Sequence, residues 1–285
     1  SSKMPPKSLH PKVFHASMAD WPVCNWYNIR YMLRLIFSEM MANTAIIFTL
    51  VHYNAEFPTS LPLSVPAAAV FGWAMWVCGP ISGPQITPII PLALVFMRHI
   101  TVIYGVVVMV GQFLGTLLGY SLALAMRPDN HPNFHGKDYG LSLRKHVSVS
   151  QAFGLEFMAA FWVTMAVSAT LDEFRPPVWS QGHITSFYAF FAVTILWLAA
   201  VIGHYTGCSV HPFRSLIPAM FNNNYQDVWI YFTAPILGMI VAVLAYEMIM
   251  SEGASTARIK AWFTDPKFDR HIDYKQLEEE EDDDS

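Results

Sequence analysis

Two short segments of the sequence place hydroxyl, glycine and proline residues in the same order. The first reads Ser82-Gly83-Pro84-Gln85-Ile86-Thr87-Pro88-Ile89, and the second reads Thr206-Gly207-Cys208-Ser209-Val210-His211-Pro212-Phe213-Arg214. In each, a hydroxyl residue precedes a glycine, and a proline follows five residues after that glycine. A Gly/Pro-interrupted segment that recurs in two halves of a membrane protein is typical of half-helices that meet near the middle of the bilayer. The pair therefore predicts a permeation site.

The chemistry of these segments follows from how each half-helix begins. Proline is well tolerated in the first turn of a helix, because its missing N–H would have no partner there. Pro88 and Pro212 thus make Thr87 and His211 the expected helix caps. Each helix N-terminus carries roughly half a positive charge, and two such ends that face each other oppose cations, protons included. A neutral hydrogen-bonding solute would exchange water for these groups, whereas an ion would not.

The composition indicates a membrane protein. Of the 285 residues, 54% are hydrophobic and 13% are charged, whereas soluble domains have about 25% charged residues. The three cysteines and eleven histidines show no disulfide or metal-ligand spacing, and no nucleotide-binding or nucleophile motif is present. We therefore expect no catalytic residue, cofactor, metal ion or nucleic-acid partner. The lipid bilayer of a plasma or organelle membrane is the expected surrounding.

Six apolar stretches have the length of about 20 residues that is needed to cross a bilayer. They are roughly 31–52, 62–80, 100–126, 150–171, 183–205 and 228–250. Two shorter apolar pieces, 88–98 and 212–221, would be about 15 Å long as helices, half of a hydrocarbon core of about 30 Å. The alternative for these pieces is an interfacial loop with no special role. The predicted fold class is an all-α membrane protein with six transmembrane helices and two re-entrant half-helices.

The two halves align as a repeat. Glu39 and Glu156, in the first and fourth spans, are 117 residues apart, and Pro88 and Pro212 are 124 apart. Three spans per repeat force the second copy to be inverted, so the half-helices enter from opposite faces. The predicted units are an N-terminal tail at 1–28, a channel domain at 29–250 with repeats at about 31–126 and 150–250, and a tail at 251–285.

The distribution of basic residues favours a cytosolic location for both tails. Lysine and arginine occur in both tails, and the connection near 53–61 has neither; an excess of these residues marks the cytosolic side. The basic connection at 127–149 argues against this orientation. The seven carboxylates from Glu278 to Asp284 are expected to form a disordered, solvated end, with partner binding as the alternative.

Over nearly all of residues 31–250, this pattern resembles the aquaporin or major intrinsic protein family. The family motif reads Ser-Gly-x-x-x-Asn-Pro-Ala, and its repeat reads Thr-Gly-x-x-x-Asn-Pro-Ala-Arg. The matching residues are Ser82, Gly83, Pro88, Thr206, Gly207, Pro212 and Arg214, with Glu39, Glu156, Gln112, Gly115, Pro218, Pro235 and Gly238 elsewhere. The resemblance implies a passive channel for water or small uncharged solutes such as glycerol, and a homotetramer with one pore in each protomer.

The motif residues themselves depart from the family. Thr87 and His211 replace both asparagines, and Ile89 and Phe213 replace both alanines. Threonine can cap a helix and donate one hydroxyl proton, whereas histidine is a poorer cap that can donate from one ring nitrogen. Because imidazole titrates near pH 6.5, His211 is a candidate pH gate. The alternative is a neutral His211, since the helix end and Arg214 disfavour a second positive charge.

The resemblance also implies the residues of a selectivity filter. The family places an arginine three residues after the second asparagine, which is Arg214 here. Counting without gaps places the other filter positions at Ala67, Ala199 and Cys208. Two alanines imply a wide mouth, similar to that of glycerol-conducting members, unless Phe213 fills the space. A gap of one residue would instead bring Phe71 or Trp197 to the filter.

The remaining acidic residues have two possible roles. In the family, glutamates such as Glu39 and Glu156 hold the loop backbone near Ser82, Gly83, Thr206 and Gly207, whereas in a transporter they would relay protons. Asp172, Glu173 and Arg175 are expected to be solvated. Aromatic residues near the span ends are expected in interfacial belts, namely Trp26, Tyr27, Tyr104, Trp179, Tyr188, Trp229, Tyr231 and Tyr246.

Three functions remain open at this point. The first is a passive channel for water and small uncharged solutes. The second is a protein of the same fold with a closed or weakly conducting pore that acts in adhesion, scaffolding or regulation, and the loss of both asparagines favours it. The third is a secondary transporter, for which the sequence shows no coupling-ion site beyond Glu39 and Glu156.

Overall fold

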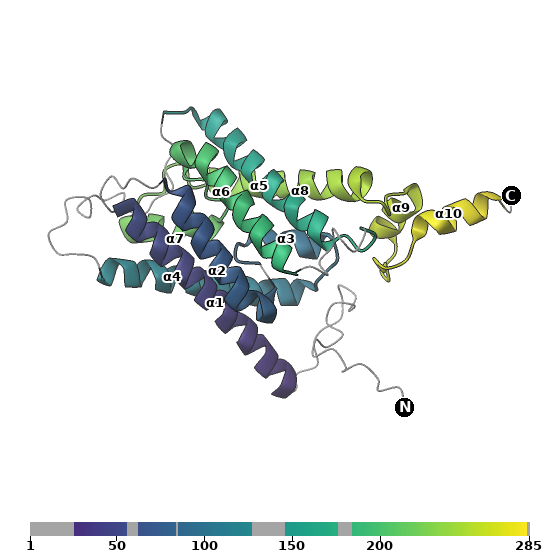
Figure 1. Cartoon of the computed structure of the whole chain (residues 1–285), viewed down its shortest axis with the longest axis horizontal. Coiled ribbons are helices and arrows are strands. Elements are labelled where there is room, and N and C mark those ends of the chain that lie inside the picture. The colour runs from purple at the N-terminus through teal and green to yellow at the C-terminus, as the bar shows by residue number, and fades with distance from the viewer. Residues whose placement is uncertain (1–25, 56–61, 84, 127–145, 176–183, 284–285) are drawn as a thin grey trace.

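The computed structural model describes residues 26–55, 62–83, 85–126, 146–175 and 184–283, and every regular element in these ranges is a helix (Figure 1). In chain order they are α1 (Trp26–Ala55), α2 (Ser64–Ser82), α3 (Ile89–Phe96), α4 (Val102–Ala125), α5 (Val149–Leu171), α6 (Ile184–Thr206), α7 (Pro212–Asn222), α8 (Ile230–Ala245), the π-helical turn η4 (Tyr246–Met250), α9 (Thr256–Thr264) and α10 (Tyr274–Asp283).

Six of these helices are long and apolar enough to cross a membrane: α1, α2, α4, α5, α6, and α8 with η4. They confirm the six predicted spans, and most helix ends lie within a few residues of the predicted ends. The helices α3 and α7 are the two predicted short ones, with 8 and 11 residues. The residues 1–25 of the predicted N-terminal tail and most of the basic connection at 127–149 lie outside the described residues.

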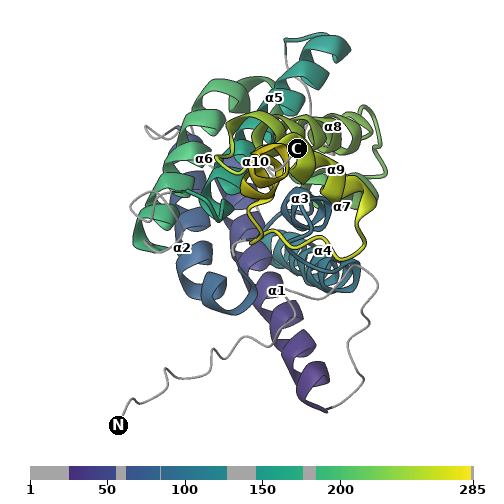
Figure 2. The same cartoon turned by 90° about the vertical axis from the view of Figure 1, so that its right-hand side faces the viewer.

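The helices form two similar halves, α1–α4 and α5–α8. Within each half the first helix packs against the last, α1 on α4 and α5 on α8, and α2 packs against α6 between the halves. Each half-helix also contacts the opposite half, α3 against α8 and α7 against α4. Figure 2 shows α3 enclosed in this way, between α4 and α8. The crossing of the halves brings the two repeated segments to the centre of the bundle.

Glycines allow the helix pairs within each half to approach closely. On α4, a Cβ added to Gly115 would strike the carbonyl oxygen of Met40, and one added to Gly111 would lie 2.7 Å from that of Ile36. On α8, a Cβ at Gly238 would strike the carbonyl oxygen of Phe157 on α5. Small residues at helix crossings are the usual way to bring apolar helices into contact within a membrane.

The Gly238→Ala variant tests this packing. Its methyl group must push α5 away from α8, and we expect a loss of about 1–3 kcal/mol of stability. The matched control is Gly154→Ala on α5, where an added Cβ meets no atom within 4 Å and alanine is the better helix former. Thermal unfolding in detergent should give a lower midpoint for Gly238→Ala only. Equal midpoints for the two variants would contradict the close contact.

The C-terminal segment, defined here as residues 251–272, folds against one end of the bundle (Figure 1). The Trp262 indole N–H donates to the Phe96 carbonyl at 3.2 Å, and Arg270 Nη1 donates to the Met97 carbonyl at 2.7 Å. Carbonyls at the C-terminal end of a helix have no partner within that helix. The C-terminal segment therefore supplies donors to the end of half-helix α3. Most of the acidic run beyond it lies in α10, so the expectation of disorder is wrong there.

Polar contacts at this end correct the expectations for Glu173, Asp172 and Tyr246, whereas Arg175 is only half-buried. Glu173 is not solvated: its carboxylate pairs with Arg270, with 2.9 Å between Oε1 and Nε. Asp172 accepts from the Tyr246 hydroxyl at 3.0 Å, so Tyr246 is buried rather than interfacial. Arg175 donates to the Ala169 carbonyl at 2.7 Å. The partners of Glu173 and Asp172 come from elements far apart in sequence, which composition alone does not reveal.

Candidate pore and its polar centre

Both repeated segments contain backbone in the left-handed region. The glycines have φ of 72° at Gly83 and 84° at Gly207, where the lack of a Cβ is an advantage. Three residues further on, Ile86 has φ of 53° and Val210 has φ of 42°. A β-branched residue there costs on the order of 1–3 kcal/mol, and such a conformation persists only where the surroundings hold it.

The two buried glutamates hold these strained residues. Glu39 Oε2 accepts from the Ile86 N–H at 3.0 Å, and Glu156 Oε2 accepts from the Val210 N–H at 3.0 Å. Oε1 of Glu156 accepts in addition from the Ser209 N–H at 2.9 Å and from a side-chain hydroxyl, that of Thr206, at 2.6 Å. In each half the carboxylate therefore contacts the N–H of the residue with positive φ, and the arrangement supports a structural role for both.

A second symmetric pair of contacts comes from two tyrosines. The Tyr104 hydroxyl on α4 donates to the Ser82 carbonyl at 3.2 Å, and the Tyr231 hydroxyl on α8 donates to the Thr206 carbonyl at 3.1 Å. Both tyrosines are buried, so their expected place in an interfacial belt is wrong. Their equivalent positions in the two halves were the sequence signal that could have identified them.

His211 caps α7, and Thr87 joins the two loops. His211 Nδ1 accepts from the backbone N–H of Arg214 at 3.1 Å. The Thr87 hydroxyl accepts only a long contact of 3.4 Å from the Ile89 N–H, and the helix cap of α3 is Pro88, one residue later than expected. The hydroxyl proton of Thr87 goes instead to the Val210 carbonyl at 2.6 Å. It is therefore used within the protein rather than offered to a solute.

Asn43 of α1 is a site residue that sequence reasoning missed. Its Oδ1 lies 2.7 Å from Nε2 of His211, and its side chain is fully buried. Both nitrogens of the His211 ring thus have partners within the protein. The sequence signal was weak, since an asparagine in an apolar span has many possible partners.

The predicted filter residues lie together around one cavity. The cavity has a volume of about 40 Å³, enough for a few water molecules, because one water needs about 10–15 Å³. Its lining includes all four predicted filter residues and both residues before the motif prolines: Ala67, Ala199, Cys208, Arg214, Thr87 and His211.

The structure also shows where the alternative filter residues lie. Phe71 lines the cavity beside Ala67, but Trp197 is exposed on the outside of α6, with its ring 6.1 Å from that of Trp162. Phe213 packs edge-on against Phe113 of α4, with ring centroids 5.4 Å apart, and does not line the cavity. The four residues of the ungapped count and Phe71 thus all line the cavity, whereas Trp197 and Phe213 do not.

Arg214 supplies the cationic group of the cavity. Its Nη1 donates to the carbonyls of Gly207 at 3.1 Å and Cys208 at 3.2 Å. These bonds fix the guanidinium against the loop before α7.

Comparison with known proteins identifies the family to which this architecture belongs. The profile described as major intrinsic protein matches residues 27–246. The chain belongs to the major intrinsic protein family. Among its relatives, aquaporin-5 of Sus scrofa is 26% identical over 254 residues, covering 87% of this chain and 92% of that protein. Aquaporin-2 of Bos taurus is 27% identical over 226 residues, covering 76% and 79%.

A solved structure shares the fold. The X-ray structure of the aquaglyceroporin from Plasmodium falciparum superposes with a TM-score of 0.67 at 17% identity, covering 77% of this chain and 97% of that chain. The bundle of six long helices and two half-helices is therefore that of the family, and this major intrinsic protein is a multi-pass integral membrane protein. Within the described ranges, no cluster of three or more His, Cys, Asp or Glu residues could hold a metal ion.

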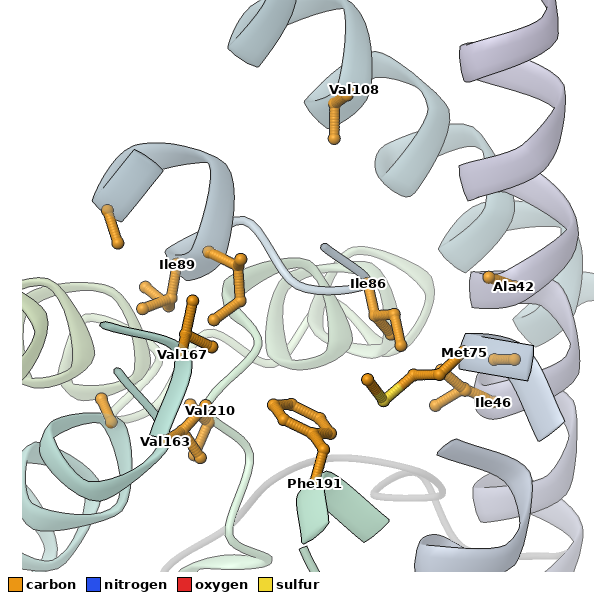
Figure 3. Close-up of a cluster of buried hydrophobic side chains, with 14 of the residues drawn as sticks. Ala42, Ile46, Met75, Ile86, Ile89, Val108, Val163, Val167, Phe191 and Val210 are labelled. Carbon is orange, nitrogen blue, oxygen red and sulfur yellow. The ribbon is translucent and has the colours of Figure 1, made fainter. Parts of the chain in front are cut away.

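Phe191 of α6 also lines the cavity in this major intrinsic protein. The side chain is 1% exposed, and Figure 3 shows its ring between Val210 and the end of the Met75 side chain of α2. Phe191 and Met75 each lie eight residues from the predicted filter alanine of their helix, which corresponds to about 12 Å. Both helices thus carry a large apolar side chain about two turns from the alanine that lines the cavity.

Proposed function

We propose that this chain is a passive channel for water and small uncharged solutes that excludes ions and protons. The observation that carries the proposal is a cavity lined by the four predicted filter residues, Thr87 and His211. The two half-helix N-termini and Arg214 oppose cations there. Membership of the family makes the chain a membrane channel rather than an enzyme. The two alanines favour a mouth wide enough for glycerol-sized solutes.

The direct test is osmotic shrinkage of liposomes that contain the purified protein. We expect faster shrinkage than in empty liposomes, and glycerol uptake measured in parallel tests the width of the filter. Ion conductance in the same membranes should equal that of the empty bilayer. Correctly inserted protein without added water permeability would contradict the proposal.

Cys208 gives a chemical test of the same cavity. Because this thiol lines the cavity, a mercurial bound to it should obstruct the path and lower water permeability. The Cys208→Ser variant should resist the mercurial. The Cys78→Ser variant is the matched control, since Cys78 is buried and absent from the cavity lining, and it should remain as sensitive as the wild type. Equal inhibition of all three proteins would place the path elsewhere.

A second candidate function is the same fold with a closed or weakly conducting pore, acting in adhesion, scaffolding or regulation. The observation that favours it is Phe191, a buried aromatic side chain that lines the cavity and lies next to Met75 (Figure 3). A narrow apolar constriction can close a channel by excluding water. Low permeability of the wild type would thus support this candidate.

The Phe191→Ala variant tests the constriction. Removing the ring should raise water permeability, because the cavity would gain the volume of a buried aromatic side chain. We expect an increase of several fold, on the order of 1 kcal/mol in the barrier. Phe190→Ala is the matched control, because Phe190 is 54% exposed on the outside of the same helix. Unchanged permeability in Phe191→Ala, with normal insertion, would exclude Phe191 as the constriction.

The resemblance also supports a homotetramer and a cytosolic location of both termini. With six spans the two termini lie on the same side of the membrane, and the basic residues of the tails favour the cytosol. Native mass spectrometry would measure the number of protomers. Protease protection of tags on the two termini would establish their side.

A further inference from the structure

We propose that Asn43 is a positioning residue that locks His211 in its neutral Nε2–H tautomer, so that the imidazole at the pore centre neither titrates nor donates to the solute. The tautomer follows from contacts within the protein. Its consequence for permeation rests on the proposed channel function.

The direction of each hydrogen bond determines the tautomer. The Arg214 amide donates to His211 Nδ1 at 3.1 Å, so Nδ1 carries no proton. The single proton of a neutral imidazole is then on Nε2, which donates to Oδ1 of Asn43 at 2.7 Å. The orientation of the Asn43 amide is fixed in turn, because its Nδ2 donates to the Glu39 carbonyl at 2.9 Å. A continuous chain of bonds therefore connects α1 to the N-terminus of α7.

A second proton on His211 would disrupt this chain. It would have to be added at Nδ1, where it would face the Arg214 amide, so that two donors would meet at the start of α7. The carboxylates nearby offer no compensation, because Glu39 and Glu156 accept from the loop amides of Ile86, Ser209 and Val210. The charged group that shares the cavity with His211 is the Arg214 guanidinium, which repels an imidazolium.

Asn43 has little freedom to release the ring. It lies on the side of α1 that faces α4, and a Cβ on Gly115 would come within 2.8 Å of the Asn43 Cβ. Its amide is fully buried and bonded at both ends. This asparagine from α1 therefore contributes to the polar centre of the pore, although it lies outside both repeated segments.

The test combines a spectroscopic and a functional measurement. Nitrogen NMR of histidine-labelled protein, with the His211 signals assigned by their loss in His211→Asn, should show the Nε2–H tautomer unchanged between about pH 5.5 and about pH 7.5. Water permeability of the wild type should be flat over the same range. Titration of His211 in the wild type within this range would overturn the proposal.

Two variants of Asn43 sharpen the test. Asn43→Asp replaces the neutral acceptor with a carboxylate, so His211 should now titrate and permeability at the acidic end should fall at least about threefold. Asn43→Leu removes the acceptor, and the Nε2 resonance should move from its wild-type position. Asn224→Asp is the control that adds the same charge outside the cavity lining, and it should behave like the wild type.

The outcomes separate this inference from the channel function. If the wild type conducts no water but His211 gives the pH-independent Nε2–H signals, the tautomer assignment is upheld and the proposed function fails. If Asn43→Asp and Asn43→Leu both leave the His211 signals unchanged, the positioning role of Asn43 is wrong, whether or not the protein conducts.

Discussion

The Glu156→Gln variant should lose most of its water permeability and a substantial part of its stability. The carboxylate accepts three bonds, from the Ser209 and Val210 amides and the Thr206 hydroxyl. Glutamine has one acceptor oxygen, so its NH₂ group must face one of these donors. Bonds to charged groups contribute about 1.5–3 kcal/mol, and a buried donor left unpaired costs about 1–3 kcal/mol. We expect a loss of about 2–5 kcal/mol.

The same variant distinguishes the structural role from proton relay. If Glu156 holds the loop, Val210 is released from its conformation at φ of 42°, and both the unfolding midpoint and the permeability fall together. If Glu156 relays protons, the midpoint stays near that of the wild type and only proton-coupled uptake is lost. Glu252→Gln, an exposed change of the same kind, is the control for both measurements. A variant equal to the wild type in both would refute each role.

The scaffold of this protein was largely predictable from sequence. The length of the apolar stretches identifies the six spans, because a helix needs about 20 residues to cross the bilayer core. The half-helices are recognisable because Pro88 and Pro212 recur at equivalent places, and because the apolar pieces after them are too short to cross. The alanines at 67 and 199 also line the cavity as counted. These features depend on local pattern and on the repeat.

The use of the polar side chains at the centre was not predictable in the same way. Thr87 and His211 were expected to offer protons to the solute, but their protons go to the Val210 carbonyl and to Asn43. The bonded partners are 123 and 168 residues away in sequence. No periodicity in the sequence indicates such a hydrogen-bonded pair, because each pair depends on how the two halves of the protein pack together.

The C-terminal segment illustrates a related limit. The sequence predicts only a tail here, and Glu173 was expected to be solvated. In the structure the segment places Arg270 between Glu173 and Glu247, and the exposure of the three side chains falls below 10%. Burial of charged residues is favourable here only because opposite charges from three elements meet. That meeting is a property of the tertiary structure.

Arg270→Met is therefore expected to detach the C-terminal segment. Arg270 pairs with Glu173 at 2.9 Å and with Glu247 at 2.7 Å, and it donates to the Met97 carbonyl at the end of α3. Methionine fills a similar volume but leaves buried carboxylate charge that Arg258 alone cannot balance. His99 lies 3.7 Å from Glu173, but it is a poor replacement for the lost cation, because burial lowers its pKa well below the usual value. Removing one partner of a buried pair costs about 3–5 kcal/mol.

The measurement is limited proteolysis of the segment in detergent, together with the unfolding midpoint. Arg270→Met should be cleaved faster at Lys260 and Lys267 than the wild type and should unfold at a lower temperature. Adding Glu173→Gln should recover part of the loss, because removing both charges of a buried pair costs far less than removing one. Lys267→Met, an exposed site in the same segment, should leave the midpoint unchanged. A midpoint for Arg270→Met equal to that of Lys267→Met would show that the buried pairs do not hold the segment.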